Sequence, residues 1–418
     1  MDLQISPTHR AAILVLLVMG CAGEPKDAAS TTDPPSGGTL LGTTGVQADP
    51  SAAIFYQASP GNVAQDSDVY VVHEDFYGIP WSSFLAGEEP PAPWVATIDV
   101  IADDARASGR PVYLALALVG GPGRAYLGNQ TVVDADTLLS PQSAWSAECY
   151  DFSSAPDAAE IEAAYLDYVS WMVDRFEPNW LNVAIEINLF LAKCPSAWPG
   201  LAAMETKAVE HARTLDPDLV VFASVELSQI YGLEEDCTVP DACFQDNLAA
   251  LELLDGDRLA LSSYPYGQPD ISTVADIPAD WLSRIADEID RPVLIAETGW
   301  NGSPIVGSLD GDCVTYGSYS EADQIAYLEW LMGQSDDLDV GLVTWWSNRD
   351  LIPAQISDSC ECTAEDQGWC DAVDVFSDVF GEFNGDIIFK YWGTMGLRTY
   401  EGDEKPALME RWRALRGG

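Results

Sequence analysis

Two glutamates stand near the ends of apolar runs that have the composition of β-strands. Glu186 lies at the end of such a run in VAIEINLF, and Glu297 lies at the end of another in VLIAETGW. A carboxylate is costly to bury in an apolar strand without a partner, so its presence there needs a cause. Two carboxyl groups that flank a glycosidic bond can cleave it, one as an acid and the other as a nucleophile or base. The alternative is a structural role, in which an arginine or a helix end satisfies each glutamate.

Short apolar runs alternate with amphipathic helical stretches after residue 50, as in a parallel sheet wrapped by helices. We expect strands at 54–59, 69–75, 111–118, 181–187, 219–226, 258–266, 292–300 and 340–346. We expect helices at 93–109, 159–176, 203–215, 321–332 and 405–415. The pattern predicts an α/β fold, a (β/α)8 TIM barrel with long disulfide-bearing loops after its strands. Such a barrel would bring Glu186 and Glu297 to opposite sides of one mouth.

Several segments carry a resemblance to a known family. AETGW at 296–300, preceded by RPVLI, resembles the nucleophile strand of clan A retaining glycosidases, especially the endo-β-1,4-galactanase and β-1,3-glucanase families. That resemblance implies Glu297 as nucleophile, Glu186 as acid/base, retention of configuration and no cofactor. SSYPY at 262–266 is similar to the sixth strand of those enzymes, which implies that Tyr264 hydrogen-bonds the nucleophile.

The sequence departs from this family in two places. Clan A acid/base residues normally follow an Asn, whereas Ile185 precedes Glu186 and the nearest Asn is Asn188, which would point to the same face of a strand. An Arg that many members keep at the end of the second strand is also absent. These departures leave open an alternative function, a catalytically inactive glycan-binding or scaffold lipoprotein on the same barrel.

Side chains that follow strand ends are candidates for substrate binding, since the C–H faces of sugars pack well on aromatic planes. VTWWSN at 343–348 resembles the eighth strand of the clan, whose tryptophan is a sugar platform. For any single Trp, burial in the core is the alternative. The predicted substrate-binding residues are His73, Asp75, Trp81, Asn188, Tyr266, Trp300, Trp345 and Trp346.

The N-terminus has the pattern of an export signal. Residues 1–21 contain a basic segment and an apolar run that is too short to span a bilayer, and they end in VMGC, which resembles the lipobox of bacterial lipoproteins. We expect lipidation at Cys21, export, and anchoring to the cell envelope at the outer membrane, because Ala22 follows the cysteine. An ordinary secretory peptide is the alternative. Residues 22–50, rich in Gly, Pro, Ser and Thr, are predicted to be a flexible tether, and 51–418 a single barrel domain.

Composition limits the partners. The net charge of −48 repels phosphate backbones, so nucleic acid is excluded, and the expected partner of a monomeric chain is a carbohydrate. Apart from Cys21, eight cysteines remain, an even number that suits disulfides in an exported protein. Local loops closed by Cys237 with Cys243, and by Cys360 or Cys362 with Cys370, are predicted. A metal site is not expected, because the chain has only three histidines and no Cys-x-x-Cys pair.

Overall fold

A closed parallel sheet forms the centre of the molecule. The computed structural model describes residues 38–49, 54–74, 76–134, 137–142, 146–233, 237–309, 312–361, 363–364, 366–372 and 390–416. Within them, every neighbouring pair of strands in the central sheet is parallel. In sheet order the strands are β11 (Val220–Phe222), β10 (Trp180–Asn182), β5 (Val112–Ala115), β4 (Val69–His73), β1 (Leu40–Thr44), β17 (Leu342–Trp345), β14 (Val293–Thr298), β13 (Leu259–Ser263) and β12 (Ser224–Glu226).

The two edges of this sheet belong to one stretch of chain. Only Ala223 separates β11 from β12, so the order from β11 round to β12 closes the sheet into a barrel. β11 and β12 together occupy the single strand position predicted at 219–226. The predicted (β/α)8 barrel is therefore confirmed.

The first barrel strand is not the predicted run at 54–59. It is β1, which pairs with β17 on one side and β4 on the other. Residues 54–57 instead form β3 (Ile54–Gln57), antiparallel to β2 (Val46–Asp49). The tether predicted over 22–50 is therefore wrong from Leu40 onward. Gly42 in β1 fits because a Cβ there would lie 2.7 Å from Val71 Cγ2, and this glycine made the segment look like a linker.

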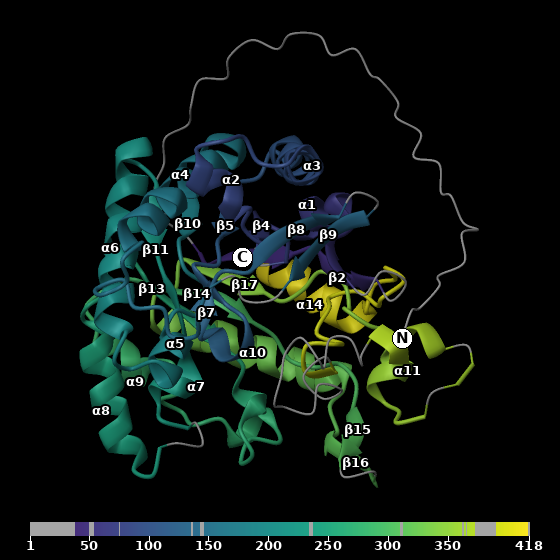
Figure 1. The fold of residues 1–418 in the computed structure, drawn as a ribbon. Helices are drawn as coiled ribbons and strands as arrows, with labels where there is room; N and C mark the ends of the chain where they lie inside the picture. Colours follow the sequence, from purple (N-terminus) through teal and green to yellow (C-terminus); the bar gives the residue numbers. More distant parts are fainter. Residues whose placement is uncertain are drawn as a thin grey trace. The chain divides into compact units, whose positions relative to one another are not determined.

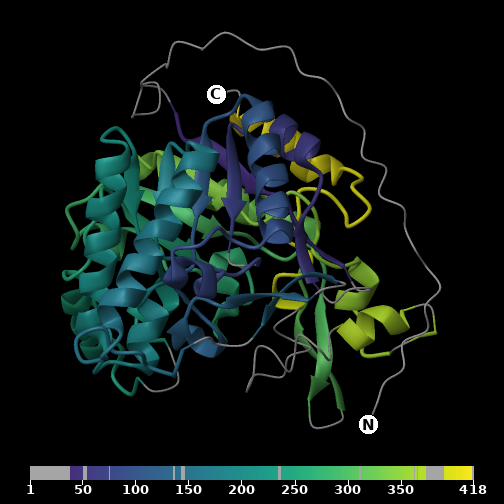
Figure 2. The ribbon, with the colours of Figure 1, turned by 45° about the horizontal axis from the view of Figure 1, so that its top comes forward.

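Helices cover the outside of the barrel (Figures 1 and 2), and α4 and α6 pack side by side. The predicted long helices are confirmed, and Gly109 ends α3 in a left-handed conformation with φ 64°. The longer helices are α1 (Pro60–Asp66), α3 (Ala92–Ser108), α4 (Ala158–Phe176), α6 (Trp198–Leu215), α8 (Pro240–Leu251), α10 (Glu321–Asp337) and α14 (Pro406–Arg416). The short ones are α2 (Trp81–Ala86), α5 (Asn188–Lys193), α7 (Leu227–Ile230), α9 (Ser283–Ala286) and α11 (Ala354–Ser357).

Two apolar clusters form the core, one inside the barrel and one between the sheet and its helices. Inside lie small and aliphatic side chains with a few aromatic ones, such as Val71, Tyr113 and Phe222. The larger outer cluster takes most of the buried tryptophans. The high tryptophan content thus serves packing between sheet and helices more than a sugar-binding surface.

Hairpins and disulfides build the loops that follow the strands. The hairpins are β6 (Val119–Gly120) with β7 (Tyr126–Leu127), β8 (Gln130–Asp134) with β9 (Thr137–Gln142), and β15 (Ile305–Leu309) with β16 (Asp312–Gly317). Disulfides join Cys149 to Cys194, Cys237 to Cys243 and Cys313 to Cys360. The predicted Cys237–Cys243 loop is confirmed, whereas Cys360 does not pair with Cys370. Cys370 is also disulfide-bonded, and Cys362 lies outside the described residues.

Two kinds of feature are not found in the described part of the chain. None of its helices combines the length and the apolar character needed to cross a membrane. Its His, Cys, Asp and Glu side chains form no group of three or more that could hold a metal ion.

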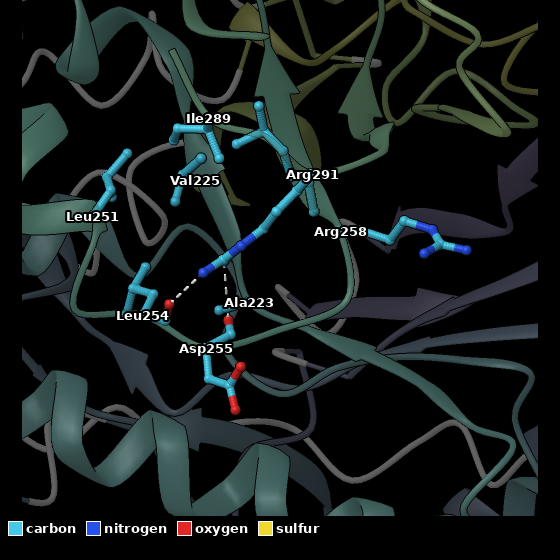
Figure 3. Close-up of a pocket in the computed structure, with 10 residues that line it drawn as sticks. Ala223, Val225, Leu251, Leu254, Asp255, Arg258, Ile289 and Arg291 are labelled. Atoms are coloured by element: carbon cyan, nitrogen blue, oxygen red, sulfur yellow. Dashed lines mark hydrogen bonds between the residues drawn. The ribbon is translucent and has the colours of Figure 1, made fainter.

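A small cavity lies beside the N-terminal ends of β13 and β14 (Figure 3). Its volume of about 20 Å³ has room for roughly one water molecule, so it is not a sugar site. Arg291 spans it and donates to the carbonyl oxygens of Leu254, at 2.8 Å, and Asp255, at 3.4 Å. The backbone N–H of Asp255 donates in turn to the buried carboxyl group of Glu205 on α6, at 3.1 Å. This end of the barrel is thus a structural network.

We expect Glu205→Gln to remove a pH dependence from folding stability. Burial raises the pKa of Glu205 from 4.5 to about 8, so the folded protein keeps a proton there that the unfolded chain loses. The stability from this protonated group is complete below pH 4.5 and is lost as the pH rises to 8, by roughly 3–5 kcal/mol. Urea unfolding of the wild type and Glu205→Gln at both pH values measures this loss. Glu210→Gln, exposed on the same helix, is the control. Parallel pH dependence in the wild type and Glu205→Gln would contradict the expectation.

Candidate active site

Glu186 lies in a turn just beyond β10. The strand ends at Asn182, so the run predicted at 181–187 is too long, and the chain turns before α5 begins at Asn188. Glu186 has a left-handed backbone with φ 48°, and its N–H donates to Oγ of Ser224 at 3.0 Å. The turn still holds the carboxylate at the C-terminal ends of the strands, where barrel enzymes place their sites.

A β-bulge orients Glu297. The register of β14 against β13 shifts by one residue, because Leu261 pairs with Ile295 and Ser262 pairs with Glu297. Ala296 faces the interior of the barrel, and the bulge directs the next side chain, Glu297, toward the mouth as well. The following residue, Thr298, points outward and hydrogen-bonds the carbonyl of Ser263.

His73 and Tyr264 face Glu297. Nδ1 of His73, the last residue of β4, lies 3.4 Å from Oε1 of Glu297. Burial, and then the charge of Arg124, lowers the pKa of His73 to about 3, so its imidazole is neutral at neutral pH and this contact is not an ion pair. Burial also raises the pKa of the Tyr264 phenol well above its ordinary value, and the negative charges of Glu297 and Glu186 raise it further. A neutral imidazole and a protonated phenol therefore face the carboxylate.

The negative charges of both glutamates raise the pKa of the Tyr264 phenol, so both carboxylates lie near it at the mouth of the barrel. Their side chains are mostly buried, with 13% of Glu186 and 11% of Glu297 exposed. Charges in such a site interact more strongly than in water. The structure thus brings together the three residues predicted to be catalytic, Glu186, Glu297 and Tyr264.

A buried polar network supports this space from inside the barrel. The amide of Asn182 donates to the Tyr113 hydroxyl at 3.2 Å and to Ser224 Oγ at 2.9 Å, and Ser224 accepts from the Glu186 backbone. Burial raises the pKa of Tyr113, the Asn182 hydrogen bond opposes this rise, and the charge of Glu297 adds to it. Sequence reasoning missed this network. The asparagine that supports the site is Asn182, not the Asn188 that was predicted.

Arg124 is a second residue that the sequence analysis missed. It ends the short 3₁₀ helix η1 (Pro122–Arg124) in the loop after β5, and its Nε donates to Oε2 of Glu186 at 3.1 Å. The resemblance implies an arginine at the end of the second strand, whereas the structure places one in the loop after the third, β5. The glycines of the segment GGPGR allow the positive φ angles of Gly121 and Gly123 that form this turn, but no local pattern links the turn to Glu186.

Trp346 is the one predicted aromatic that reaches the site. Its ring lies 5.1 Å from His73 and 5.8 Å from Phe76 between centroids, and 6% of the residue is exposed. Its indole N–H has no hydrogen-bond partner among the described residues. The resemblance implied either Trp345 or Trp346, and the position of Trp346 beside His73 fits a sugar platform.

Apart from His73, the other predicted binding residues that are described lie in the core, and the structure does not bring them to the site. Each is buried, and most of their polar atoms are used by the fold. The indole N–H of Trp81 donates to the carbonyl of Gly128, and that of Trp345 donates to the carbonyl of Met395. The hydroxyl of Tyr266 donates to the carbonyl of Tyr391, Trp300 packs among Tyr266, Tyr319 and Tyr327, and Asn188 bonds Glu226 and Gln229.

Other acids near the strand ends also have structural contacts or are not described. Glu74 accepts a hydrogen bond from Tyr168 on α4, outside the barrel. Glu226 caps α7 by accepting from the backbone N–H groups of Ser228 and Gln229. Asp75, another acid near a strand end, lies outside the described residues. So does Cys21, the predicted lipidation residue.

Comparison with known proteins identifies the fold. No protein-family model and no curated protein matches the sequence. An exo-β-1,4-mannosidase from Opitutaceae bacterium strain TAV5 matches with a TM-score of 0.53 and 15% identity over 86% of this chain and 54% of that chain, so this chain spans about half of its length. A GH5_18 protein from Bifidobacterium longum subsp. longum, in complex with Manb1-4GlcNAc, matches with a TM-score of 0.54 and 15% identity over 86% and 72%. A β-glucosidase, 1317, matches with a TM-score of 0.53 and 13% identity over 91% and 99%. These neighbours are clan A glycoside hydrolases, and this chain has their (β/α)8-barrel fold.

Proposed function

We propose that this protein is a retaining hydrolase of β-linked glycosides, with Glu297 as nucleophile and Glu186 as acid/base. The observation that carries the proposal is that Glu186 and Glu297, from opposite parts of the barrel, place largely buried carboxylates at one mouth, beside the phenol of Tyr264, whose pKa both charges raise. The shared fold with an exo-β-1,4-mannosidase and a β-glucosidase supports it.

The site geometry suits two displacements at the anomeric carbon. In the first, the Glu297 carboxylate attacks that carbon, its bond to the leaving oxygen breaks, and Glu186 gives its proton to this oxygen. In the second, water attacks the glycosyl ester, Glu186 takes a proton from the water, and Glu297 is released. Two inversions retain the configuration. We assign to the protonated phenol of Tyr264 and to the neutral His73, whose Nδ1 lies 3.4 Å from Oε1 of Glu297, the role of orienting this carboxylate for attack.

The substrate class is tested by turnover. The full-length protein is assayed against aryl β-mannosides, β-glucosides and β-galactosides, and against β-mannan, β-1,3-glucan and β-galactan, with aryl α-glycosides as controls. We expect hydrolysis of at least one β-glycoside and of no α-glycoside. If no glycoside is cut but one of the polymers binds, the inactive glycan-binding alternative replaces this proposal.

Trp346→Ala is expected to weaken substrate binding and transition-state binding together. Loss of the platform beside His73 should lower kcat/KM by about 10- to 100-fold, which corresponds to roughly 1.4–2.8 kcal/mol. Trp345→Phe is the matched control, because Trp345 is fully buried and faces away from the site. We expect that control to lower Tm and to leave KM unchanged. A raised KM in Trp345→Phe, with kcat/KM unchanged in Trp346→Ala, would show that Trp346 is not the platform.

Export and lipid anchoring are proposed on the sequence alone. Lipidation of Cys21 would place the enzyme at the outer membrane, where it meets extracellular glycans. Fractionation of cells that produce the wild type and Cys21→Ser tests this proposal. We expect the wild type in the membrane fraction and the variant outside it, and an unchanged distribution would contradict the lipid anchor.

A further inference from the structure

The side chain of Glu186 is held by a charged group from another loop, Arg124. Nε of Arg124 donates to Oε2 of Glu186 at 3.1 Å, and both side chains are mostly buried. A buried, charge-assisted hydrogen bond of this kind is costly to lose on one side only, since the partner is left as an unpaired charge. The pair therefore constrains where the Glu186 carboxylate points.

The loop that carries Arg124 is fixed to the helix that follows Glu186. A Cβ at Gly123 would lie 3.0 Å from Cε of Lys193, the last residue of α5, so η1 packs closely on that helix. The Cys149–Cys194 disulfide joins the far end of the same loop to the residue just after α5. The backbone N–H of Cys149 donates to the carbonyl of Ala125, next to Arg124, at 2.8 Å. The disulfide and the close packing thus fix the loop that carries Arg124 to the segment that carries Glu186.

The neighbouring residue explains why such a constraint is needed. Ile185 points into the apolar cluster inside the barrel and offers the site no hydrogen-bonding group. The left-handed backbone at Glu186 is fixed by Ser224, but this bond leaves the carboxylate free to rotate. We infer that Arg124 is the positioning residue of the acid/base Glu186, an inference that rests on the proposed function. Its cation also stabilises the Glu186 carboxylate that forms when the proton passes to the leaving oxygen.

A residue that acts through the acid/base should matter most where proton donation matters most. We expect Arg124→Ala to lower kcat/KM, which reports the first displacement, by about 10- to 100-fold on a glycoside with a poor leaving group. On a dinitrophenyl glycoside, whose leaving group needs no proton, the loss in kcat/KM should be about threefold or less. Arg124→Lys keeps the charge but not the planar fork of donors, and it should recover part of the loss. Arg106→Ala, at an exposed ion pair with Asp103 on α3, is the control and should leave kcat unchanged.

The decisive experiment is a double-mutant cycle of Arg124→Ala and Glu186→Ala, measured by kcat and by Tm. If Arg124 acts through Glu186, Arg124→Ala will lower kcat little further in the Glu186→Ala protein. The loss of Tm in the double variant will then be smaller than the sum of the losses in the two single variants. Additive losses, or an Arg124→Ala loss that is equal for both leaving groups, would overturn the inference while the glycosidase proposal stands. A wild type that cuts no glycoside would overturn the proposed function and this inference with it. If the two substitutions are then non-additive in Tm, the Arg124–Glu186 pair has a structural role only.

Discussion

Glu297→Gln should abolish hydrolysis and leave the fold intact. Without a carboxylate no glycosyl ester can form, so kcat should fall by on the order of 10⁴-fold or more, even for a dinitrophenyl glycoside. Glutamine has the shape of glutamate and keeps a side-chain oxygen facing Tyr264 and His73, so Tm should change little. The measurement is kcat on the best aryl β-glycoside of the substrate panel.

Glu226→Gln is the matched control for this loss. Glu226 also ends a barrel strand near the mouth, but its carboxylate caps α7. We expect it to lower Tm through the weakened cap, by roughly 1 kcal/mol of stability, with hydrolysis retained. Full activity in Glu297→Gln, or loss of activity only in Glu226→Gln, would move the nucleophile to another residue.

Glu186→Ala should have the second-largest effect, and it should depend on the leaving group. Loss of general acid catalysis should lower kcat about 100- to 10,000-fold on a poor leaving group. On a dinitrophenyl glycoside the first step survives, and the glycosyl ester should accumulate because the second step lacks its base. Azide, a nucleophile that needs no general base, should then restore turnover and yield a β-glycosyl azide. The measurement is the burst of dinitrophenolate with and without azide.

Two outcomes would contradict that role for Glu186. Equal losses in kcat/KM, which reports the first displacement, on both leaving groups would show that Glu186 does not donate the proton. An azide product of the α configuration would show that a single displacement, not two, takes place. Either result would exclude the pair of roles proposed for Glu186 and Glu297.

The periodic pattern predicted most of the fold because buried strands and amphipathic helices leave strong signals. VLIAET and LALSS are apolar because both of their faces are covered, one inside the barrel and one by helices. β1 left no such signal. Its sequence, LLGTT, combines a glycine, which is required by the close approach of Val71, with threonines that lie near the mouth. A first strand of this composition looks like the end of a linker.

The candidate site was predictable where a residue type is unusual for its position. Glu297 and Glu186 stood out as carboxylates at the ends of apolar runs, and Tyr264 was implied by the same resemblance. Aromatic residues were not diagnostic, because Trp81, Trp300 and Trp345 lie at or after strand ends as Trp346 does but turn into the outer core. Only tertiary packing separates these two outcomes.

Arg124 and Asn182 could not be found from the sequence for another reason. Arg124 reaches Glu186 from a distant loop, and its position depends on hairpin β6–β7 and on the Cys149–Cys194 cross-link. Asn182 looks like an ordinary strand residue, and its role depends on Tyr113 and Ser224 in neighbouring strands. Contacts between strands far apart in the chain leave no local pattern.

The most direct test of the central claim is to trap the glycosyl enzyme. The wild type is incubated with activated 2-deoxy-2-fluoro-β-glycosides of the manno, gluco and galacto configurations, digested and analysed by mass spectrometry. We expect one added fluorosugar on the peptide that contains Glu297, and none on the Glu297→Gln protein. A label on another carboxylate, or turnover of β-glycosides with no label at all, would contradict it.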